Sequence, residues 1–240
     1  MKIHEYTSGT IIVALLLAFL PQAVRAQTSD AKLFAKVLFD QLEYAPAPAG
    51  QPISMEAVGW VGGDVNRLWL RAEGAQSTVE HAGEVEVEAL YGRLITPFFD
   101  AVVGARVDRS WEGGGQTRGH LAVGVQGLAP YKFEVSPTLY VSDEGHVSAR
   151  FVAAYGFLFT QRLVLEPEVE LNAAVQDVPA WGVGSGLNNV NAGVRLRYEV
   201  HRKVAPYIGY DHTWRFGETA DLAGGDVSTG ALVFGVRLWR

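Results

Sequence analysis

Hydrophobic and polar residues alternate along most of the chain beyond residue 33, in segments of roughly ten residues. In residues 84–89, three glutamates fall on one face of an extended strand, and two valines and an alanine fall on the other. Residues 162–176 and 189–200 repeat this pattern with other charged and apolar residues. A shift of the register by one residue would move every charge to the apolar face, so the register of each strand is strongly specified.

The alternation predicts about twelve long strands. They span residues 34–45, 54–62, 66–76, 84–95, 99–110, 118–128, 132–142, 146–157, 162–176, 188–200, 204–216 and 228–240. The links between them alternate between shorter connections, as at 63–65 and 96–98, and longer ones, as at 45–54 and 218–227. An even number of tilted strands, with short turns at one end and long loops at the other, is typical of outer-membrane barrels.

The predicted fold class is therefore all-β: a transmembrane, antiparallel, up-and-down β-barrel of about 12 strands, of the bacterial outer-membrane type. A soluble sandwich or a lipocalin-like barrel also alternates and is the alternative. Aromatic residues near the strand ends favour the membrane barrel, because they form girdles at the two interfaces. These are Trp60, Tyr91, Phe98, Phe99, Tyr131, Tyr155, Phe157, Tyr198, Tyr207, Tyr210 and Trp214.

The first 26 residues have the features of a secretory signal peptide. Lys2 begins a weakly basic start, an apolar run follows over residues 10–20, and Val24 and Ala26 are small residues before the expected cleavage site. The run is shorter than the roughly 20 residues of a membrane helix, although an N-terminal anchor is the alternative. The predicted parts are a signal peptide at 1–26, a short periplasmic segment at 27–36 and the barrel at 37–240. An even strand count then places both termini in the periplasm of a Gram-negative bacterium.

The charge pattern determines what the barrel interior holds. The chain has 26 acidic and 20 basic residues and no cysteine, which argues against nucleic acid as a partner and against disulfides. If the apolar faces contact lipid, the interior carries both signs of charge. The predicted interior residues are Arg67, Arg71, Glu73, Glu84, Glu86, Glu88, Asp100, Arg106, Asp108, His120, Gln126, Lys132, Glu134, His146, Arg150, Glu166, Glu168, Glu170, Arg195, Arg197, Glu199, Asp211, Arg215 and Arg237. Such a set forms either a structural network of ion pairs or a polar passage that attracts cations.

No catalytic site is expected. His146 and Ser148 have a spacing that is compatible with a lipid hydrolase, but both face the predicted interior, where a lipid substrate cannot reach them. The glycine runs at 113–115 and 224–225 lack the context of a phosphate-binding loop. The chain is therefore predicted not to be an enzyme.

Eight segments in order give the chain a resemblance to the copper resistance protein B family of outer-membrane proteins. These segments are FDQLE (39–43), NRLWLRAEG (66–74), GLAPY (127–131), YVSDEG (140–145), TQRL (160–163), GSGL (184–187), APYIG (205–209) and FGETAD (216–221). The resemblance runs from about Phe39 to Trp239. It implies an outer-membrane location, copper ions as ligand or substrate, and a role in copper tolerance or homeostasis. Contact with outer-membrane lipid and a periplasmic multicopper oxidase as a candidate partner also follow.

The chain departs from that family in its N-terminal segment. Family members often carry a Met- and His-rich stretch before the barrel, whereas residues 27–36 contain neither residue and Met55 is the one methionine of the mature chain. Cu(I) prefers thioether and thiolate ligands, and Cu(II) accepts imidazole and carboxylate. A copper site in this chain is therefore expected to use histidine and carboxylate groups in the barrel or at its mouth.

Five histidines follow the signal peptide, and no two are spaced as a metal motif. His120 and His146 lie on predicted interior faces near one end of the barrel and are the candidate metal ligands. His81 falls in a predicted outer loop, His201 in a basic turn and His212 on the lipid-facing phase. The predicted function is binding or passage of copper ions through a charged lumen. The alternative is a narrow non-specific porin or a structural barrel, and neither the oxidation state of copper nor the oligomeric state follows from the sequence.

Overall fold

A computed structural model describes residues 33–46, 52–78, 82–111, 115–224 and 227–240. These residues form an almost entirely β structure, and no helix among them is long and apolar enough to cross a membrane. The strands are β1 (Phe34–Tyr44), β2 (Pro52–Gly62), β3 (Asn66–Ser77), β4 (Gly83–Thr96), β5 (Phe99–Ser110), β6 (Gln116–Ala129), β7 (Phe133–Ser142), β8 (Val147–Ala154), β9 (Phe157–Leu158), β10 (Leu163–Ala174), β11 (Gly186–Tyr198), β12 (Val204–Arg215) and β13 (Ser228–Trp239).

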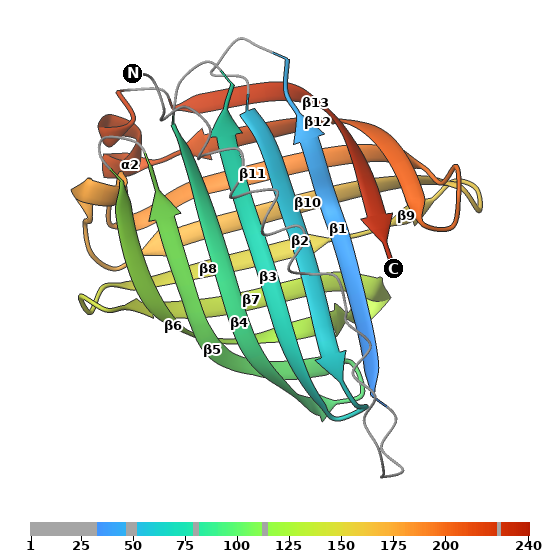
Figure 1. The fold of residues 1–240 in the computed structure, drawn as a ribbon. Helices are drawn as coiled ribbons and strands as arrows, with labels where there is room; N and C mark the ends of the chain where they lie inside the picture. Colours follow the sequence, from blue (N-terminus) through green and yellow to red (C-terminus); the bar gives the residue numbers. More distant parts are fainter. Residues whose placement is uncertain (1–32, 47–51, 79–81, 112–114, 225–226) are drawn as a thin grey trace, which may run out of the picture. The chain divides into compact units, whose positions relative to one another are not determined.

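The sheet closes on itself. Each strand pairs antiparallel with its neighbour in sequence, and β13 pairs with β1 (Figure 1). Both β8 and β9 pair with β10, so they fill one position, and the barrel has twelve strand positions. The predicted fold class is thus confirmed. Because β13 pairs with β1, the described part of the sheet has no free first or last strand, as a membrane-spanning sheet requires.

The prediction of one unbroken strand over 146–157 is wrong. β8 ends at Ala154, and β9 resumes at Phe157 in the same register against β10. Tyr155 lies between them and donates its backbone N–H to the carbonyl of Pro167 at 3.0 Å. Because Pro167 has no N–H, it cannot return the second hydrogen bond of the ladder. The interruption therefore comes from a proline on the partner strand.

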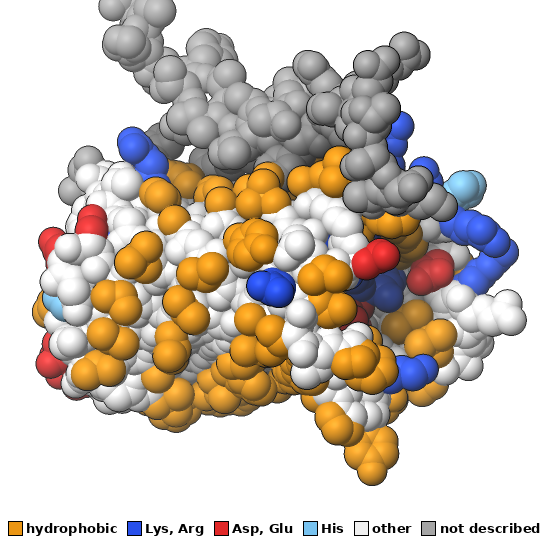
Figure 2. Space-filling view, turned by 90° about the horizontal axis from the view of Figure 1, so that it is seen from below, with side chains coloured by type: hydrophobic (Ala, Val, Ile, Leu, Met, Phe, Trp, Pro, Cys, Tyr) orange, Lys and Arg blue, Asp and Glu red, His pale blue; other side chains and the backbone are white. Residues whose placement is uncertain are grey.

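The outer face of the barrel is apolar. Leu121, Leu139 and Leu232 are 68%, 58% and 55% exposed, and hydrophobic side chains are spread over the surface seen in Figure 2. Charged residues such as Glu88, Asp100 and Arg106 are instead buried inside. An apolar exterior around a charged interior is the reverse of a soluble protein and is the arrangement of an outer-membrane barrel.

Two residues that the sequence assigns to the aromatic girdle lie inside instead. Trp60 pairs with Trp69 on the interior face, and the guanidinium of Arg67 stacks 5.3 Å from its ring centre. Tyr207 is 8% exposed and lines an interior cavity. The girdle assignment is wrong for both, because an aromatic residue near a strand end can lie on either face of the strand. Tyr91, Phe98 and the other exposed members remain on the outside.

The two ends of the barrel differ. The terminal end, where β1 begins and β13 ends, has the short turns, including a 3-10 turn at Pro130–Lys132. The opposite loop end has the longer connections, with a 3-10 turn at Pro179–Trp181 and helix α2 (Gly217–Leu222). Helix α2 lies in a stretch that the sequence assigns to a loop. β1 begins at Phe34, inside the range 27–36 predicted as a separate segment, and the predicted signal peptide at 1–26 lies outside the described residues.

Candidate functional site in the barrel lumen

The lumen contains a wide cavity and a very small one. The wide cavity, here called the vestibule, measures about 730 Å³ and is lined by residues of the loop-end half of the barrel. The small cavity measures about 10 Å³ and lies toward the terminal end. Gln41, Glu168 and Arg195 line both cavities and therefore form the floor of the vestibule. The larger of these two cavities therefore lies at the loop end of the barrel.

Acidic residues outnumber basic ones in the vestibule. Its lining contains nine carboxylates, namely Glu43, Glu56, Glu73, Glu84, Glu86, Asp108, Glu168, Glu170 and Asp211. It also contains six arginines, namely Arg106, Arg109, Arg118, Arg150, Arg195 and Arg215. An excess of negative charge in a cavity with low-dielectric walls raises the local concentration of cations.

Four of these carboxylates form a row across neighbouring strands. Glu56 on β2 lies opposite Glu73 on β3, Glu73 opposite Glu86 on β4, and Glu86 opposite Asp108 on β5. We call this set the carboxylate row. Directly opposed residues have Cβ atoms about 5 Å apart, and like charges at that distance destabilise a sheet. The row therefore needs positive charge to be stable.

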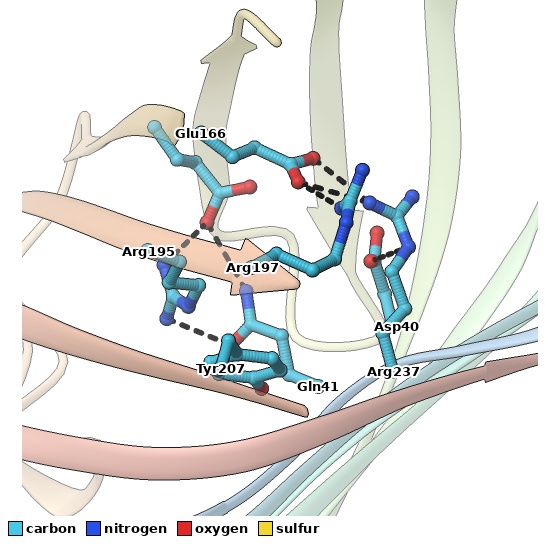
Figure 3. A pocket seen from close by; sticks show the side chains of 8 residues that line it. Asp40, Gln41, Glu166, Arg195, Arg197, Tyr207 and Arg237 are labelled. Atoms are coloured by element: carbon cyan, nitrogen blue, oxygen red, sulfur yellow. Dashed lines mark hydrogen bonds and ion pairs between the residues drawn. The ribbon is translucent and has the colours of Figure 1, made fainter. Parts of the chain in front are cut away.

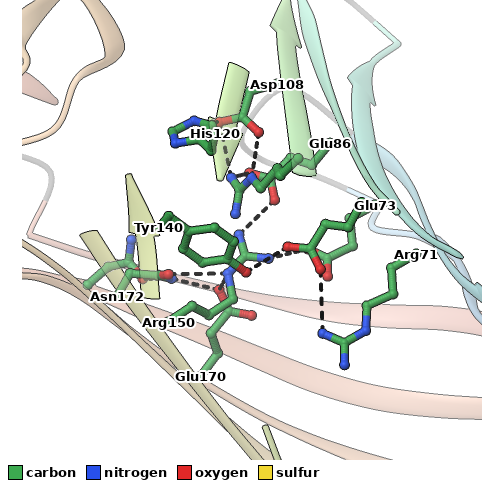
Figure 4. Close-up of polar contacts among 12 residues, drawn as sticks. Arg71, Glu73, Glu86, Asp108, His120, Tyr140, Arg150, Glu170 and Asn172 are labelled. Atoms are coloured by element: carbon green, nitrogen blue, oxygen red, sulfur yellow. Dashed lines mark hydrogen bonds and ion pairs between the residues drawn. The ribbon is translucent and has the colours of Figure 1, made fainter. Parts of the chain in front are cut away.

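Arg150 and Arg106 supply most of that charge, and Arg118 adds a contact with Asp108 at 3.4 Å. Arg150 on β8 reaches across the lumen and contacts Glu73 at 3.0 Å and Glu86 at 2.7 Å (Figure 4). Arg106 contacts Glu86 and Asp108, each at 2.5 Å. Glu56, at the other end of the row, has no hydrogen bond or ion pair with the described residues. Positive charge is thus concentrated at the Asp108 end of the row.

His120 is held by the last member of the row. Its Nε2 lies 2.9 Å from Oδ2 of Asp108, and its side chain is 3% exposed. A carboxylate only accepts hydrogen bonds, so Nε2 carries the proton in the neutral ring and donates it to Asp108. Nδ1 then keeps its lone pair, and this atom is buried with no hydrogen-bond partner among the described residues. A carboxylate on one ring nitrogen and a free lone pair on the other is how proteins prepare a histidine to bind a metal ion.

His146 occupies the turn between β7 and β8. Its Nδ1 lies 3.5 Å from Oε2 of Glu144, and its side chain is 31% exposed. Its backbone N–H donates to Oγ of Ser142 at 3.0 Å, and Ser142 pairs with His120 across β6 and β7. Both predicted ligands therefore line the vestibule near one stretch of its wall. Within the described residues, however, no group of three His, Cys, Asp or Glu side chains is arranged to hold a metal ion.

The other histidines lie away from the lumen where the structure describes them. His201 is in the turn before β12, where it forms an isolated bridge with Val204. His212 lies between Tyr210 and Trp214 on the outer phase of β12, with ring centres 6.1 Å and 4.3 Å apart. His81 lies outside the described residues. The placements of His201 and His212 agree with the turn and the lipid-facing phase that the sequence indicates.

A loop of the loop end reaches over the vestibule. Trp181, from the connection between β10 and β11, stacks on the guanidinium of Arg118 on β6, 4.5 Å from the ring centre. Arg118 also contacts Asp108 at 3.4 Å. Both Arg118 and Trp181 line the vestibule. Asp108 therefore joins His120, Arg106 and Arg118, and through Arg118 it is linked to the loop.

Ion pairs surround the small cavity, and one of them, between Arg237 and Glu166, joins strands that are not neighbours (Figure 3). Arg237 on β13 contacts Asp40 on β1 at 2.7 Å and Glu166 on β10 at 3.0 Å. Arg197 on β11 also pairs with Glu166. We call these four residues the constriction layer. A cavity of this size holds about one water molecule, so it has no room for a hydrated ion.

A bulge in β1 supplies part of this layer. The register of β1 against β2 shifts between Phe39 and Gln41. As a result, the side chains of the neighbours Asp40 and Gln41 both point into the lumen. Asp40 forms an ion pair with Arg237, and the Gln41 side chain donates to Glu168 at 3.3 Å and accepts from Arg195 at 2.9 Å. Bulges commonly redirect a side chain in this way next to functional sites. The sequence-based set of interior residues omits β1 and β2, although two polar residues in succession at 40–41 signal the break in alternation.

Solved structures and curated proteins resemble this chain. The NanC porin superposes with a TM-score of 0.55 at 14% identity, covering 85% of this chain and 99% of that one. A KdgM porin gives a TM-score of 0.51 at 11% identity, covering 85% and 98%. These likenesses concern the fold, and they define the class of the protein as an outer-membrane β-barrel.

The sequence comparisons define the family. The model described as "Copper resistance protein B precursor (CopB)" matches residues 33–240. A copper resistance protein B homolog of Pseudomonas syringae pv. tomato is 39% identical over 216 residues, which cover 89% of this chain and 72% of that protein. Copper resistance protein B of Escherichia coli is 37% identical over 219 residues, covering 88% and 71%. The chain belongs to the copper resistance protein B family, which confirms the resemblance carried by its eight segments.

Proposed function

We propose that this protein serves copper homeostasis in the outer membrane by binding copper ions in the vestibule or passing them through the lumen. Family membership supports the role of copper. The observation that carries the proposal for the barrel itself is His120, a buried imidazole of the vestibule lining that Asp108 holds and whose Nδ1 has no hydrogen-bond partner among the described residues. An imidazole and carboxylates are ligands that Cu(II) accepts.

Copper is the substrate in this proposal and not a resident cofactor. The described residues offer no complete three-ligand site, so a single bound ion would keep water molecules in its coordination shell. His120 supplies one ligand through Nδ1, and His146, at the same wall of the vestibule, is the candidate second. A site with few protein ligands suits an ion that must be released again, because conduction requires binding weak enough to leave.

The orientation of the barrel follows from its two ends. In outer-membrane barrels the short turns face the periplasm and the long loops face outward. We therefore place the terminal end, with the start of β1 and the end of β13, in the periplasm and the vestibule mouth on the outer side. A protease added to intact cells should cleave an epitope inserted in the 175–185 loop and leave a C-terminal epitope intact; cleavage of only the C-terminal epitope would reverse the orientation.

A copper titration of the purified barrel in detergent tests the proposal. Cu(II) added to the wild type should give an electron paramagnetic resonance signal with nitrogen hyperfine coupling from imidazole. His120→Ala combined with His146→Ala should remove that coupling and weaken binding at least several-fold, whereas His212→Ala, on the outer phase, should change neither. Unchanged binding in the double variant would remove both histidines from the site. A deletion strain with unchanged copper tolerance and content would overturn the role in homeostasis.

A narrow porin or a structural barrel is the second candidate. The ion pairs that cross the lumen favour a structural role, because they join strands that are not neighbours, such as β8 with β3 and β13 with β10. If no copper binds and the barrel does not conduct, the structural role is correct. Conductance that does not depend on copper, without copper binding, indicates a porin. A periplasmic multicopper oxidase as partner is tested by co-purification from cells grown with copper.

A further inference from the structure

The small cavity below the vestibule floor has a defined chemistry. The vestibule of about 730 Å³ ends at Gln41, Glu168 and Arg195, and these three residues also line the small cavity of about 10 Å³ on the terminal-end side. The residues that take up the space come from β1, β10, β11 and β13, and their side chains meet end to end. None of the four members of the constriction layer lines the vestibule. The layer is therefore a separate element of the lumen, placed between the vestibule and the terminal end.

Charge in the constriction layer is balanced. Asp40 and Glu166 contribute two negative charges, and Arg197 and Arg237 contribute two positive ones. Arg237 is the link between the two carboxylates, with its Nε 2.7 Å from Asp40 and its Nη1 3.0 Å from Glu166. The side chain of Arg237 is 17% exposed, so it retains contact with solvent-accessible space. The guanidinium of Arg237 therefore occupies the place between the two carboxylates in which a cation would bind both of them.

We propose that the constriction layer is the gate of the barrel and that Arg237 is its specificity-determining residue. A cation that moves down from the vestibule takes the place of the Arg237 guanidinium between Asp40 and Glu166, and Arg237 swings aside. Anions find no such position, because each arginine of the layer is already paired with a carboxylate. Carboxylate oxygens accept Cu(II) and other divalent cations, so the layer favours cations by charge and not copper in particular.

This inference deepens the proposed function, since it names the step that limits passage. The test of this inference uses potassium chloride and contains no copper, so the gate proposal and the proposed copper function can fail separately. The purified barrel is inserted into planar lipid bilayers, and two quantities are measured: the single-channel conductance, and the reversal potential in a salt gradient. The wild type should show a small conductance. A wild type that conducts as a permanently open, non-selective pore would overturn the closure.

Arg237→Ala is the decisive variant. It removes the link between the carboxylates and leaves the layer with a net negative charge, so the conductance should rise several-fold and the reversal potential should shift toward cation selectivity. Arg67→Ala is the matched control, because Arg67 also forms an ion pair, with Asp100 at 3.0 Å, but lines neither cavity. The control should conduct like the wild type. Equal conductance of Arg237→Ala and wild type, or an equal rise in both variants, would overturn the proposal.

Glu166→Gln gives a second, nearly isosteric test if Arg237→Ala does not fold. It frees both arginines from their shared carboxylate and leaves the layer with a net positive charge. The conductance should rise, but the reversal potential should shift toward anions, opposite to the shift in Arg237→Ala. Heat-modifiable mobility in gel electrophoresis checks the folding of each variant. A shift of Glu166→Gln toward cations would show that charge in the layer does not determine selectivity and would overturn the proposal.

Discussion

The vestibule and the constriction layer are built from the same chemistry but have very different free volumes, about 730 Å³ against about 10 Å³. In the vestibule, the carboxylate row lies flat along β2 to β5, and Arg150 is the arginine that reaches it from the far wall. In the constriction layer, side chains from β1, β10, β11 and β13 meet within the lumen. The comparison shows that the placement of paired charges, more than their number, determines whether a narrow barrel is open or filled.

The largest expected effect comes from removing the arginine that crosses the vestibule. Arg150→Ala leaves Glu73, Glu86 and Glu170 without their shared partner, and these carboxylates then repel one another. Because the three are partly exposed to the vestibule, the loss of unfolding free energy should be about 2–3 kcal/mol, at the low end for a broken buried pair. Urea unfolding in detergent measures it. Arg202→Ala, in an exposed turn, should change stability by less than about 0.5 kcal/mol. Similar effects in both variants would contradict the role of the crossing arginine.

A smaller effect is expected at the end of the row that holds His120. Asp108→Asn removes the carboxylate that accepts the Nε2 proton, so the ring loses its fixed tautomer and orientation. Copper affinity should fall by about tenfold, as it does for other partners of metal-binding histidines. Isothermal titration calorimetry with Cu(II) measures this change. Glu84→Gln is the control, since it also removes a vestibule carboxylate but has no contact with His120 among the described residues. An equal loss in both variants would show that the total charge, and not the orientation of His120, determines affinity.

The smallest expected effect concerns the loop over the vestibule mouth. Trp181→Ala removes the ring that stacks on Arg118. A cation–π contact at a partly exposed site contributes about 0.5–1 kcal/mol, so the unfolding free energy should fall by no more than this amount. Trp181→Phe keeps an aromatic face and should recover part of the loss. A loss of several kcal/mol would mean that the loop supports the barrel as a whole and does not simply cover the vestibule.

The alternation of residues was sufficient to predict the barrel, most strand positions and the interior placement of many charges from β3 onward. Glu84, Glu86 and Glu88 follow a strict period of two, and all three face the interior with the register that the pattern requires. The pattern failed where the backbone departs from that period. The β1 bulge brings both Asp40 and Gln41 to the interior, and Pro167 on β10 interrupts the strand that pairs with it. The alternation of a single strand does not show how it affects the strand beside it.

The candidate site was predicted in part. His120 and His146 were placed inside, and the structure brings both to the wall of the vestibule. The partner of His120 was not predicted. Asp108 and His120 lie on neighbouring strands, and their contact depends on how the hairpin of β5 and β6 pairs: Arg106 is the direct partner of His120, and Asp108 reaches it diagonally. Diagonal contacts depend on the twist of the sheet, which the alternation of residues does not reveal.

By itself, the sequence determined which face of the wall the charged residues take along the regular strands from β3 onward, because a period of two assigns each side chain to one face of a strand. It also determined the family, through the order of short segments along the whole barrel. Only the tertiary structure decided which charges meet across the lumen, as with Arg150 and Glu73 or Arg237 and Glu166. Closure of the sheet brings strands together that are far apart in sequence, and the tilt and stagger of the barrel set the level at which their side chains meet.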